Sequence, residues 1–440
     1  MKLIFKKINY SDVSLLFFLI FATLCSYILE FNIKDTANQY FWCVEIKKDF
    51  TFSLLGNIKL PIHCDEGPYL SAISSIDYFF SESNPYQKRP LWILSIKTFF
   101  LLFSFIFDSL LSEYQIFRLS TLFLQIVILF SITKLFLSIL KIDLKKTSNY
   151  LPILVLILFP NIRWNIFFPS HGNLTLLATL LSLYVIKYRY IKLNNIDLTF
   201  IIFGFLSLVH RSFLVFGFLI ITYFLFQKNF KSKKIYSALQ LLSPTILYEL
   251  IIYVSPFNSY DWNRSEYNQF YWIIDLFQSK QTKNGDDFCQ TFETFFVCNI
   301  EITLNYLMFF IIPLFAAIIL FILLRLFNKK ILDLNNLLYI SIGIYFFWSL
   351  QGWYPEFRFI NYSIGYLILL SLIMMIEVLG GKKYLSYISI IIFYFSMDYL
   401  EPYSKVNFEF NAINIFSTVV FLIYLIDFLS RKKNKIFYSR

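Results

Sequence analysis

Charged residues are scarce in this chain. Of its 440 residues only 15% are Asp, Glu, Lys or Arg, whereas 58% are hydrophobic. The apolar residues come in long runs rather than at the spacing of a soluble amphipathic helix. This composition predicts an all-α polytopic membrane protein instead of a soluble globular domain.

Signals for cleavage and for internal duplication are also lacking. No small-residue cleavage site follows the first apolar run, 12–31, which therefore predicts an uncleaved signal anchor. The absence of an evident repeat or low-complexity linker argues against a transporter built from inverted halves and favours one membrane domain over 1–440. The net charge of +11 comes from small Lys and Arg clusters between apolar runs, so membrane topology explains it better than a nucleic-acid partner.

The apolar runs predict about twelve transmembrane helices with both termini inside. They cover about 12–31, 115–138, 150–169, 172–189, 197–211, 213–227, 235–255, 302–325, 336–353, 359–379, 384–400 and 411–430. One further run, 91–107, is nearly long enough to cross a hydrocarbon core of ~30 Å. If this run does not cross, the basic loops lie on the same side as the basic N-terminus, as the positive-inside rule requires. We therefore expect 91–107 to lie in the outer interface of the membrane.

This topology leaves two long outer segments, at about 32–114 and 256–301. Four of the five cysteines fall in them: Cys43, Cys64, Cys289 and Cys298. An even number of exported cysteines suggests disulfides, most simply one within each segment, although the sequence leaves the pairing open. A metal site is the weaker interpretation, because no Cys-x-x-Cys spacing occurs.

Histidine is rare as well. His63, His171 and His210 are the only three, and all fall on the outer side in this topology. Together with Asp65 they offer ligands for a divalent ion, but no two of them have the sequence spacing of metal ligands. No cofactor is firmly implied, and polar surface roles are the simpler expectation.

Two short helices are expected in the first outer segment. One of them starts with acids and the other with cations. The two starts read Cys64-Asp65-Glu66-Gly67-Pro68-Tyr69 and Asn84-Pro85-Tyr86-Gln87-Lys88-Arg89-Pro90-Leu91. After the first start, apolar residues recur at helical spacing: Leu70, Ile73, Ile76 and Phe80. Acids at a helix start are often only caps, worth ~0.3–1 kcal/mol, and cations beside an interface often only contact lipid headgroups. Acids and cations in one outer loop fit sugar transfer from a lipid phosphate, which needs a base for the acceptor and cations for the departing phosphate.

The order of these motifs resembles the dolichyl- or undecaprenyl-phosphate-dependent GT-C glycosyltransferases. The protein O-mannosyltransferase and lipid A aminoarabinose transferase group is nearest. An Asp-Glu-x-x-Tyr helix and a Lys-x-Pro-Leu helix precede Phe117-Arg118-Leu119-Ser120 at the start of the next span. Similar stretches follow at 159–163, 210–212 and 353–359. The similarity covers about residues 10–380, in pattern more than in identity, and implies a GT-C-like fold with two interfacial helices.

The resemblance implies roles for the residues that match the family's motifs. Asp65 matches the catalytic base and Glu66 its acidic neighbour. Lys88 matches the lysine that meets the lipid phosphate, but Arg89 stands in place of the first proline, so either cation can be the phosphate ligand. Arg358 matches an arginine near the phosphate.

Supporting roles are expected for several other residues: Tyr69, Arg118, His210 and Arg211. Arg118 matches an arginine that would hold the acidic loop. Both it and Arg163 can equally be simple interface anchors, because an Arg near a span is either at the interface or paired inside a cavity. Many members of the family it resembles have an acid at the start of the fourth span, where this chain has Ser170-His171-Gly172-Asn173, so the resemblance assigns no role there.

The function expected from the sequence is inverting transfer of a sugar from a polyprenyl-phosphate carrier to a lipid, glycan or protein acceptor. The expected place is the outer, periplasmic face of a bacterial inner membrane, among membrane lipids. Two alternatives stay open. A flippase would line a central cavity with its charged residues, and an O-antigen polymerase or ligase would carry its long outer loop late in the chain.

Overall fold

The fold is known from a computed structural model of the chain. The residues it describes are 10–27, 52–54, 58–60, 66–79, 89–144, 147–188, 192–193, 196–225, 234–254, 300–301, 303–304, 307, 311–326, 332–350, 360–380, 383–396 and 412–437. These residues are helical apart from loops and two short antiparallel strand pairs: β1 (Phe52–Leu54) with β2 (Ile58–Leu60), and β3 (Lys192–Leu193) with β4 (Ile196–Asp197). The expected all-α class is therefore confirmed in its main feature.

The chain packs as two compact units, which are described separately. The first comprises Met1–Ile20, Glu30–Leu135 and Trp164–Phe277, and the second Phe21–Leu29, Phe136–Arg163 and Gln278–Arg440. The expectation of one membrane domain over 1–440 stays a prediction.

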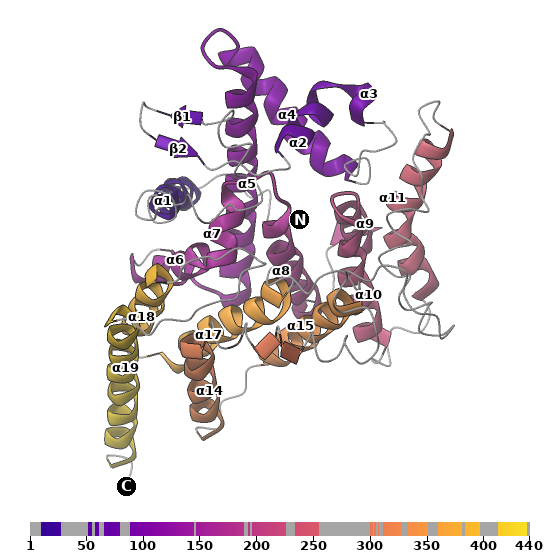
Figure 1. The fold of residues 1–440 in the computed structure, drawn as a ribbon. Helices are drawn as coiled ribbons and strands as arrows, with labels where there is room; N and C mark the ends of the chain where they lie inside the picture. Colours follow the sequence, from indigo (N-terminus) through magenta and orange to yellow (C-terminus); the bar gives the residue numbers. More distant parts are fainter. Residues whose placement is uncertain are drawn as a thin grey trace. The chain divides into compact units, whose positions relative to one another are not determined.

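The helices of the first unit carry most of the residues singled out above. They are α2 (Glu66–Ser74), α3 (Ile76–Phe79), α4 (Pro90–Phe107), α5 (Glu113–Leu140, whose last turn belongs to the second unit), α8 (Gly172–Tyr188), α9 (Thr199–Ser207), the 3₁₀ turn η6 (Arg211–Phe213), α10 (Leu214–Leu225) and α11 (Lys234–Val254). The helix α1 (Tyr10–Tyr27) is divided between the two units. Figure 1 shows α5 as a long, nearly straight helix.

The second unit contains the C-terminal helices. They are η5 (Thr147–Tyr150), α6 (Leu151–Leu158), the start of α7 (Pro160–Ile166), α14 (Ile311–Leu326), α15 (Leu332–Leu350), the π-helical turn η8 (Asn361–Gly365), α17 (Tyr366–Leu379), α18 (Lys383–Ser396) and α19 (Ala412–Phe437). The helices α18 and α19 lie side by side, and the Ser389 hydroxyl donates to the carbonyl of Ser417.

Within the part of the chain that the structure describes, four helices are long and apolar enough to cross a membrane. They span Pro90–Phe107, Glu113–Leu140, Tyr236–Val254 and Tyr362–Leu379. Shorter apolar helices of 10–17 residues occupy several of the other expected spans. The membrane character expected from composition is thus supported, whereas the count of twelve spans stays a prediction.

Two of the expected spans are not continuous long helices. The run 150–169 is interrupted at Phe159, because α7 starts at Pro160, which has no N–H to donate and whose ring clashes with the preceding turn. The run 197–211 forms only the nine residues of α9, about 14 Å of helix. As continuous helices both expectations were wrong, and the apolar run was a better guide to burial than to helix length.

The helix expected after Asp65 is also divided. It ends at Ser74, and α3 begins at Ile76, where the hydroxyl of Ser75 accepts the N–H of Tyr78 at 3.2 Å. Ile73 is buried, but Ile76 is 61% exposed, so the single apolar stripe expected across this segment was wrong. A serine that caps a new helix changes the face that the following residues present.

The run 91–107 forms a helix as expected, with Pro90 in its first turn, where a missing N–H costs nothing. Its first half packs inward through Trp92, Ile93 and Ile96. Its second half exposes apolar side chains, most of all Phe105 at 91%. That surface suits lipid contact, and since α4 is long enough to cross, its interfacial position stays a prediction.

Close packing fixes α9 and α10 against α11. A Cβ at Gly204 would lie 2.6 Å from the carbonyl oxygen of Leu241, and one at Gly217 would lie 2.4 Å from a methyl carbon of the same leucine. At Gly204 the backbone of α11 leaves no room for a side chain, whereas at Gly217 the side chain of Leu241 would have to shift.

Candidate functional site

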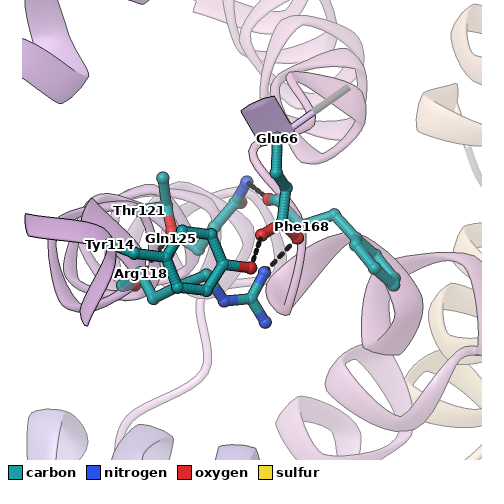
Figure 2. A network of polar contacts seen from close by, with 6 residues as sticks. All are labelled: Glu66, Tyr114, Arg118, Thr121, Gln125 and Phe168. Carbon is teal, nitrogen blue, oxygen red and sulfur yellow. Dashed lines mark hydrogen bonds and ion pairs between the residues drawn. The ribbon is translucent and has the colours of Figure 1, made fainter. Parts of the chain in front are cut away.

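The first turn of α2 is fixed to α5 by a buried ion pair. Glu66 and Arg118 are only 1% and 4% exposed, and Nη1 of Arg118 donates to Oε1 of Glu66. The hydroxyl of Tyr114 donates to the second carboxylate oxygen at 2.6 Å. Figure 2 shows the guanidinium and the phenol each reaching one oxygen of the carboxylate. A buried ion pair persists only where such additional hydrogen bonds offset the cost of desolvation, so the contact holds α2 firmly.

One face of α5 carries a polar stripe. Tyr114, Arg118, Thr121 and Gln125 follow one another at intervals of three and four residues, which places them on the same side of a helix. The stripe is unusual in a helix that is otherwise apolar enough to span a membrane. Because every member is buried or hydrogen-bonded, the stripe is a structural scaffold for the elements that meet α5.

Gln125 holds the turn between α7 and α8. Its Nε2 donates to the carbonyls of Phe168 at 3.2 Å and Ser170 at 2.6 Å, and its Oε1 accepts from Nδ2 of Asn173 at 3.1 Å. The carbonyl of Pro169, between them, accepts from Nε1 of Trp92 at 2.9 Å. Three consecutive carbonyls are thus fixed by side chains of α4 and α5.

The start of α4 is tied to two neighbours. The N–H of Leu91 donates to the carbonyl of Leu208 at 3.1 Å, just after the end of α9. Nη1 of Arg89 donates to the hydroxyl of Tyr69 on α2 at 2.9 Å. The cation that begins the second helix therefore contacts the helix that begins with the acids.

Two histidines form a stacked pair in the same unit. The rings of His171 and His210 lie 4.5 Å apart at 17°, and the indole of Trp92 meets His171 edge-on at 6.4 Å. Nδ1 of His210 lies 2.6 Å from the hydroxyl of Ser212. The backbone N–H of Ser212 also points at this nitrogen, at 3.4 Å. The neighbouring Arg211 forms an ion pair with Glu249 of α11.

The structure brings part of the expected site together. Glu66, Tyr69, Arg89 and Arg118 form connected contacts. His210 and Arg211 lie at the α9–α10 turn, whose first residue, Leu208, contacts the start of α4. Several expected residues lie outside the described part of the chain: Asp65, Lys88, Arg358, His63, Cys43, Cys64, Cys289 and Cys298. Within the described part, Cys25 is a free thiol, and no group of three or more His, Cys, Asp or Glu side chains is placed to hold a metal ion.

The stripe on α5 and the histidine pair were not expected from the sequence. His171 and His210 are 39 residues apart, and nothing in their local sequence indicates that they meet. The stripe had a signal, since polar residues at helical spacing within an apolar span are costly unless they are paired. The structure adds three described residues to the site expected from the sequence: Tyr114, Trp92 and Gln125.

Arg163 is not an interface anchor. It lies in the second unit, is 1% exposed, and its Nη1 donates to the carbonyl of Tyr394 at 3.3 Å. Nearby, Nδ2 of Asn161 donates to the hydroxyl of Tyr366 at 3.3 Å. The anchor interpretation was wrong because the helix break at Phe159 turns this short helix into the protein interior.

Gln125→Leu is expected to lower the free energy of unfolding by about 2–3 kcal/mol, because the buried carbonyl of Phe168, the half-buried carbonyl of Ser170 and the amide of Asn173 each lose a hydrogen bond. Thermal unfolding of the purified protein in detergent measures the effect. Ser131→Ala on the exposed side of α5 is the matched control, and it should change stability by only a few tenths of a kcal/mol. Equal unfolding temperatures for the two variants would contradict the role of Gln125.

Comparisons with protein-family models, curated proteins and solved structures found no match to this chain. A functional assignment therefore depends on the residues and contacts described above.

Proposed function

We propose that the protein is a membrane glycosyltransferase that transfers a sugar from a polyprenyl-phosphate carrier to a lipid, glycan or protein acceptor. The observation that carries the proposal is the buried Glu66–Arg118 ion pair at the start of α2. The ion pair fixes the acidic start of α2 to the membrane helix α5. Arg89 also contacts α2, through the hydroxyl of Tyr69. In this proposal the ion pair holds Asp65 near Arg89 and near α4, whose exposed apolar residues a lipid-linked substrate can reach.

The two acids have different roles in this proposal. Both carboxylate oxygens of Glu66 are engaged by Arg118 and Tyr114, so Glu66 positions the helix start instead of taking a proton. Asp65 directly precedes Glu66 in the sequence and is the base. It removes a proton from the acceptor, whose oxygen or nitrogen attacks the anomeric carbon while the bond from that carbon to the carrier phosphate breaks.

The departing carrier phosphate gains charge in this step. Arg89 is the described cation proposed to stabilise it, together with Lys88 and Arg358, which the family resemblance assigns to the same task. Exposed apolar side chains of α4, which begin with Leu94 and continue to its far end, suit a substrate held in the bilayer. The proposed location is the outer face of a bacterial inner membrane.

The proposal is tested in cells that lack the protein. Mass spectrometry of envelope lipids, glycans and proteins is compared between these cells and cells complemented with the wild-type chain. The expected result is at least one species whose mass differs by a sugar residue, with recovery on complementation. Identical glycan profiles in the two cell types would argue against sugar transfer, whereas a changed distribution of intact lipid-linked glycans across the membrane would favour a flippase.

Arg89→Ala is expected to weaken binding of undecaprenyl phosphate about tenfold or more, because one charge-assisted hydrogen bond to phosphate is lost. Thermal stabilisation of the purified protein by increasing lipid concentrations measures the affinity.

Two variants serve as controls for Arg89→Ala. Tyr69→Phe removes the hydrogen bond to Arg89 but leaves the cation, so the affinity should stay close to that of the wild type. Lys97→Ala removes another cation of the same helix, two turns further on, and should also have little effect. If Tyr69→Phe weakened binding as much as Arg89→Ala, the tyrosine contact and not the charge would be the important feature.

A further inference from the structure

The last helix of the second unit, α19, packs antiparallel to α18. The Ser389 hydroxyl of α18 donates to the carbonyl of Ser417. Further along α19, the hydroxyl of Tyr424 donates to the carbonyl of Gly380 at 3.1 Å, in the turn between α17 and α18. This turn therefore lies at the level of Tyr424, and α19 continues past it for about 20 Å to its end at Phe437.

One face of α19 is both apolar and exposed. Val419, Leu422, Ile426 and Leu429 follow one another at helical spacing, and all four are exposed, Ile426 most of all at 66%. The other face, which includes Tyr424, is buried. We call these four residues the apolar stripe of α19, and such a face suits contact with the acyl chains of lipids.

The sequence changes from apolar to basic directly after this stripe. Four cations, here called the basic run, lie in the last two turns of the helix: Arg431, Lys432, Lys433 and Lys435. Arg431 is exposed and pairs with Asp427, the only acidic residue in the sequence of α19. The end of the helix therefore carries an excess of positive charge.

The helix dipole does not account for the whole basic run. Cations near a helix C-terminus are favourable, but this effect falls off within the last turn. Arg431, Lys432 and Lys433 lie more than one turn before the end of α19 at Phe437. The dipole thus explains Lys435 alone, and another anionic partner is needed for the rest.

The start of α18 has features of a membrane–water boundary. Nζ of Lys383 donates to one carboxylate oxygen of Glu377 at 2.6 Å, and the hydroxyl of Tyr387 donates to the other at 2.7 Å. The neighbouring Tyr384 is exposed, and tyrosine is enriched where the hydrocarbon core meets the headgroups. Arg431 lies about 10 Å further along α19 than this turn, so the basic run falls in the headgroup layer.

We infer that the end of α19 is a binding surface for anionic phospholipids. The basic run contacts their headgroup phosphates, and the apolar stripe contacts their acyl chains. The cations match the phosphates in charge, and the stripe leads directly up to the cations, which a soluble polyanion would not require. The inference does not depend on sugar transfer.

The experiment measures which lipid headgroups lie beside the basic run. The full-length protein is placed in phosphatidylcholine nanodiscs that contain a small and equal fraction of either phosphatidylglycerol or phosphatidylcholine with a photoreactive headgroup. After irradiation, mass spectrometry quantifies the lipid attached to residues 427–440. The phosphatidylglycerol probe is expected to be captured about fivefold or more above the phosphatidylcholine probe, because each Lys or Arg near an anionic surface contributes a factor of about five.

Three variants test whether the charge of the basic run causes this preference. The first removes its four cations and should capture both probes equally: R431A, K432A, K433A and K435A. The second is the matched control, which removes four cations before and at the start of α11 and should keep the wild-type preference: K228A, K231A, K233A and K234A. The third keeps the charge and should also behave like the wild type: K432R, K433R and K435R.

Several outcomes would overturn the inference. Equal capture of the two probes by the wild type would do so, as would an unchanged preference in the first variant. An equal loss in the matched control would show that total charge alone matters, and a loss in the arginine variant would show that charge is not what the surface provides. Equal capture together with binding of an RNA oligonucleotide, lost in the first variant, would assign the basic run to a soluble polyanion. A normal unfolding temperature of the first variant in pure phosphatidylcholine shows that the fold is intact.

Discussion

Arg118→Ala is expected to lower the free energy of unfolding by about 3–5 kcal/mol, the largest stability effect of the single substitutions considered. The substitution leaves the carboxylate of Glu66, which is 1% exposed, without its ion-pair partner in the protein interior. The hydrogen bond from the Tyr114 hydroxyl does not compensate a buried negative charge. Thermal unfolding in detergent measures the loss, and sugar transfer should fall with it because the start of α2 is released.

A double substitution separates the unpaired charge from other effects of removing Arg118. Glu66→Gln combined with Arg118→Met removes both charges and should recover most of the stability, because well-packed neutral groups often replace a buried ion pair without loss. Arg325→Ala is a matched control on α14, where the guanidinium is exposed and lies 5.2 Å from the Phe321 ring centroid. It should cost well under 1 kcal/mol. If the double variant is as unstable as Arg118→Ala, the buried charge is not the cause.

Apolar runs predicted most helices, because a membrane helix is defined by length and composition. The long helix α5 and the helix α4 formed where the sequence indicated them. The helix breaks at Phe159 and Ser75 were missed. Each depends on one residue, a proline or a capping serine, which ends a helix without interrupting the apolar run around it. Interruptions of this kind require attention to individual residues within an apolar run.

The site was only partly predictable for a different reason. The expectation that Arg118 holds the acidic loop came from the family resemblance, and the contact with Glu66 agrees with it. The pairing of His171 with His210, in contrast, depends on how α8 packs against the α9–α10 turn. Helical periodicity in the sequence does not predict this packing. The stripe from Tyr114 to Gln125 was visible in the sequence as polar residues on one face of an apolar helix. Reading each span for such faces would have identified α5 as the scaffold of the site.

Asp65→Asn is expected to reduce the rate of sugar transfer by about 10²–10⁴-fold, the usual contribution of a general base. The side chains have nearly the same shape, and the ion pair of the next residue stays intact, so the variant should fold like the wild type. Transfer is measured in membrane vesicles by the appearance of the sugar-dependent mass found in complemented cells. Affinity for undecaprenyl phosphate is measured on the same preparation.

Comparison with other acid substitutions identifies the base. Asp77→Asn removes an exposed acid of α3, twelve residues after Asp65, and should leave both rate and affinity unchanged. Glu66→Gln leaves Arg118 buried without its counter-ion, so its loss of activity should come with a lower unfolding temperature, whereas Asp65→Asn loses rate alone. A base acts in the transition state, whereas the role proposed for Arg89 is to bind the carrier phosphate, so Asp65→Asn should keep the affinity that Arg89→Ala loses. Full transfer activity in a normally folded Asp65→Asn protein would remove the base from the mechanism and, with it, the reason to assign sugar transfer to this loop.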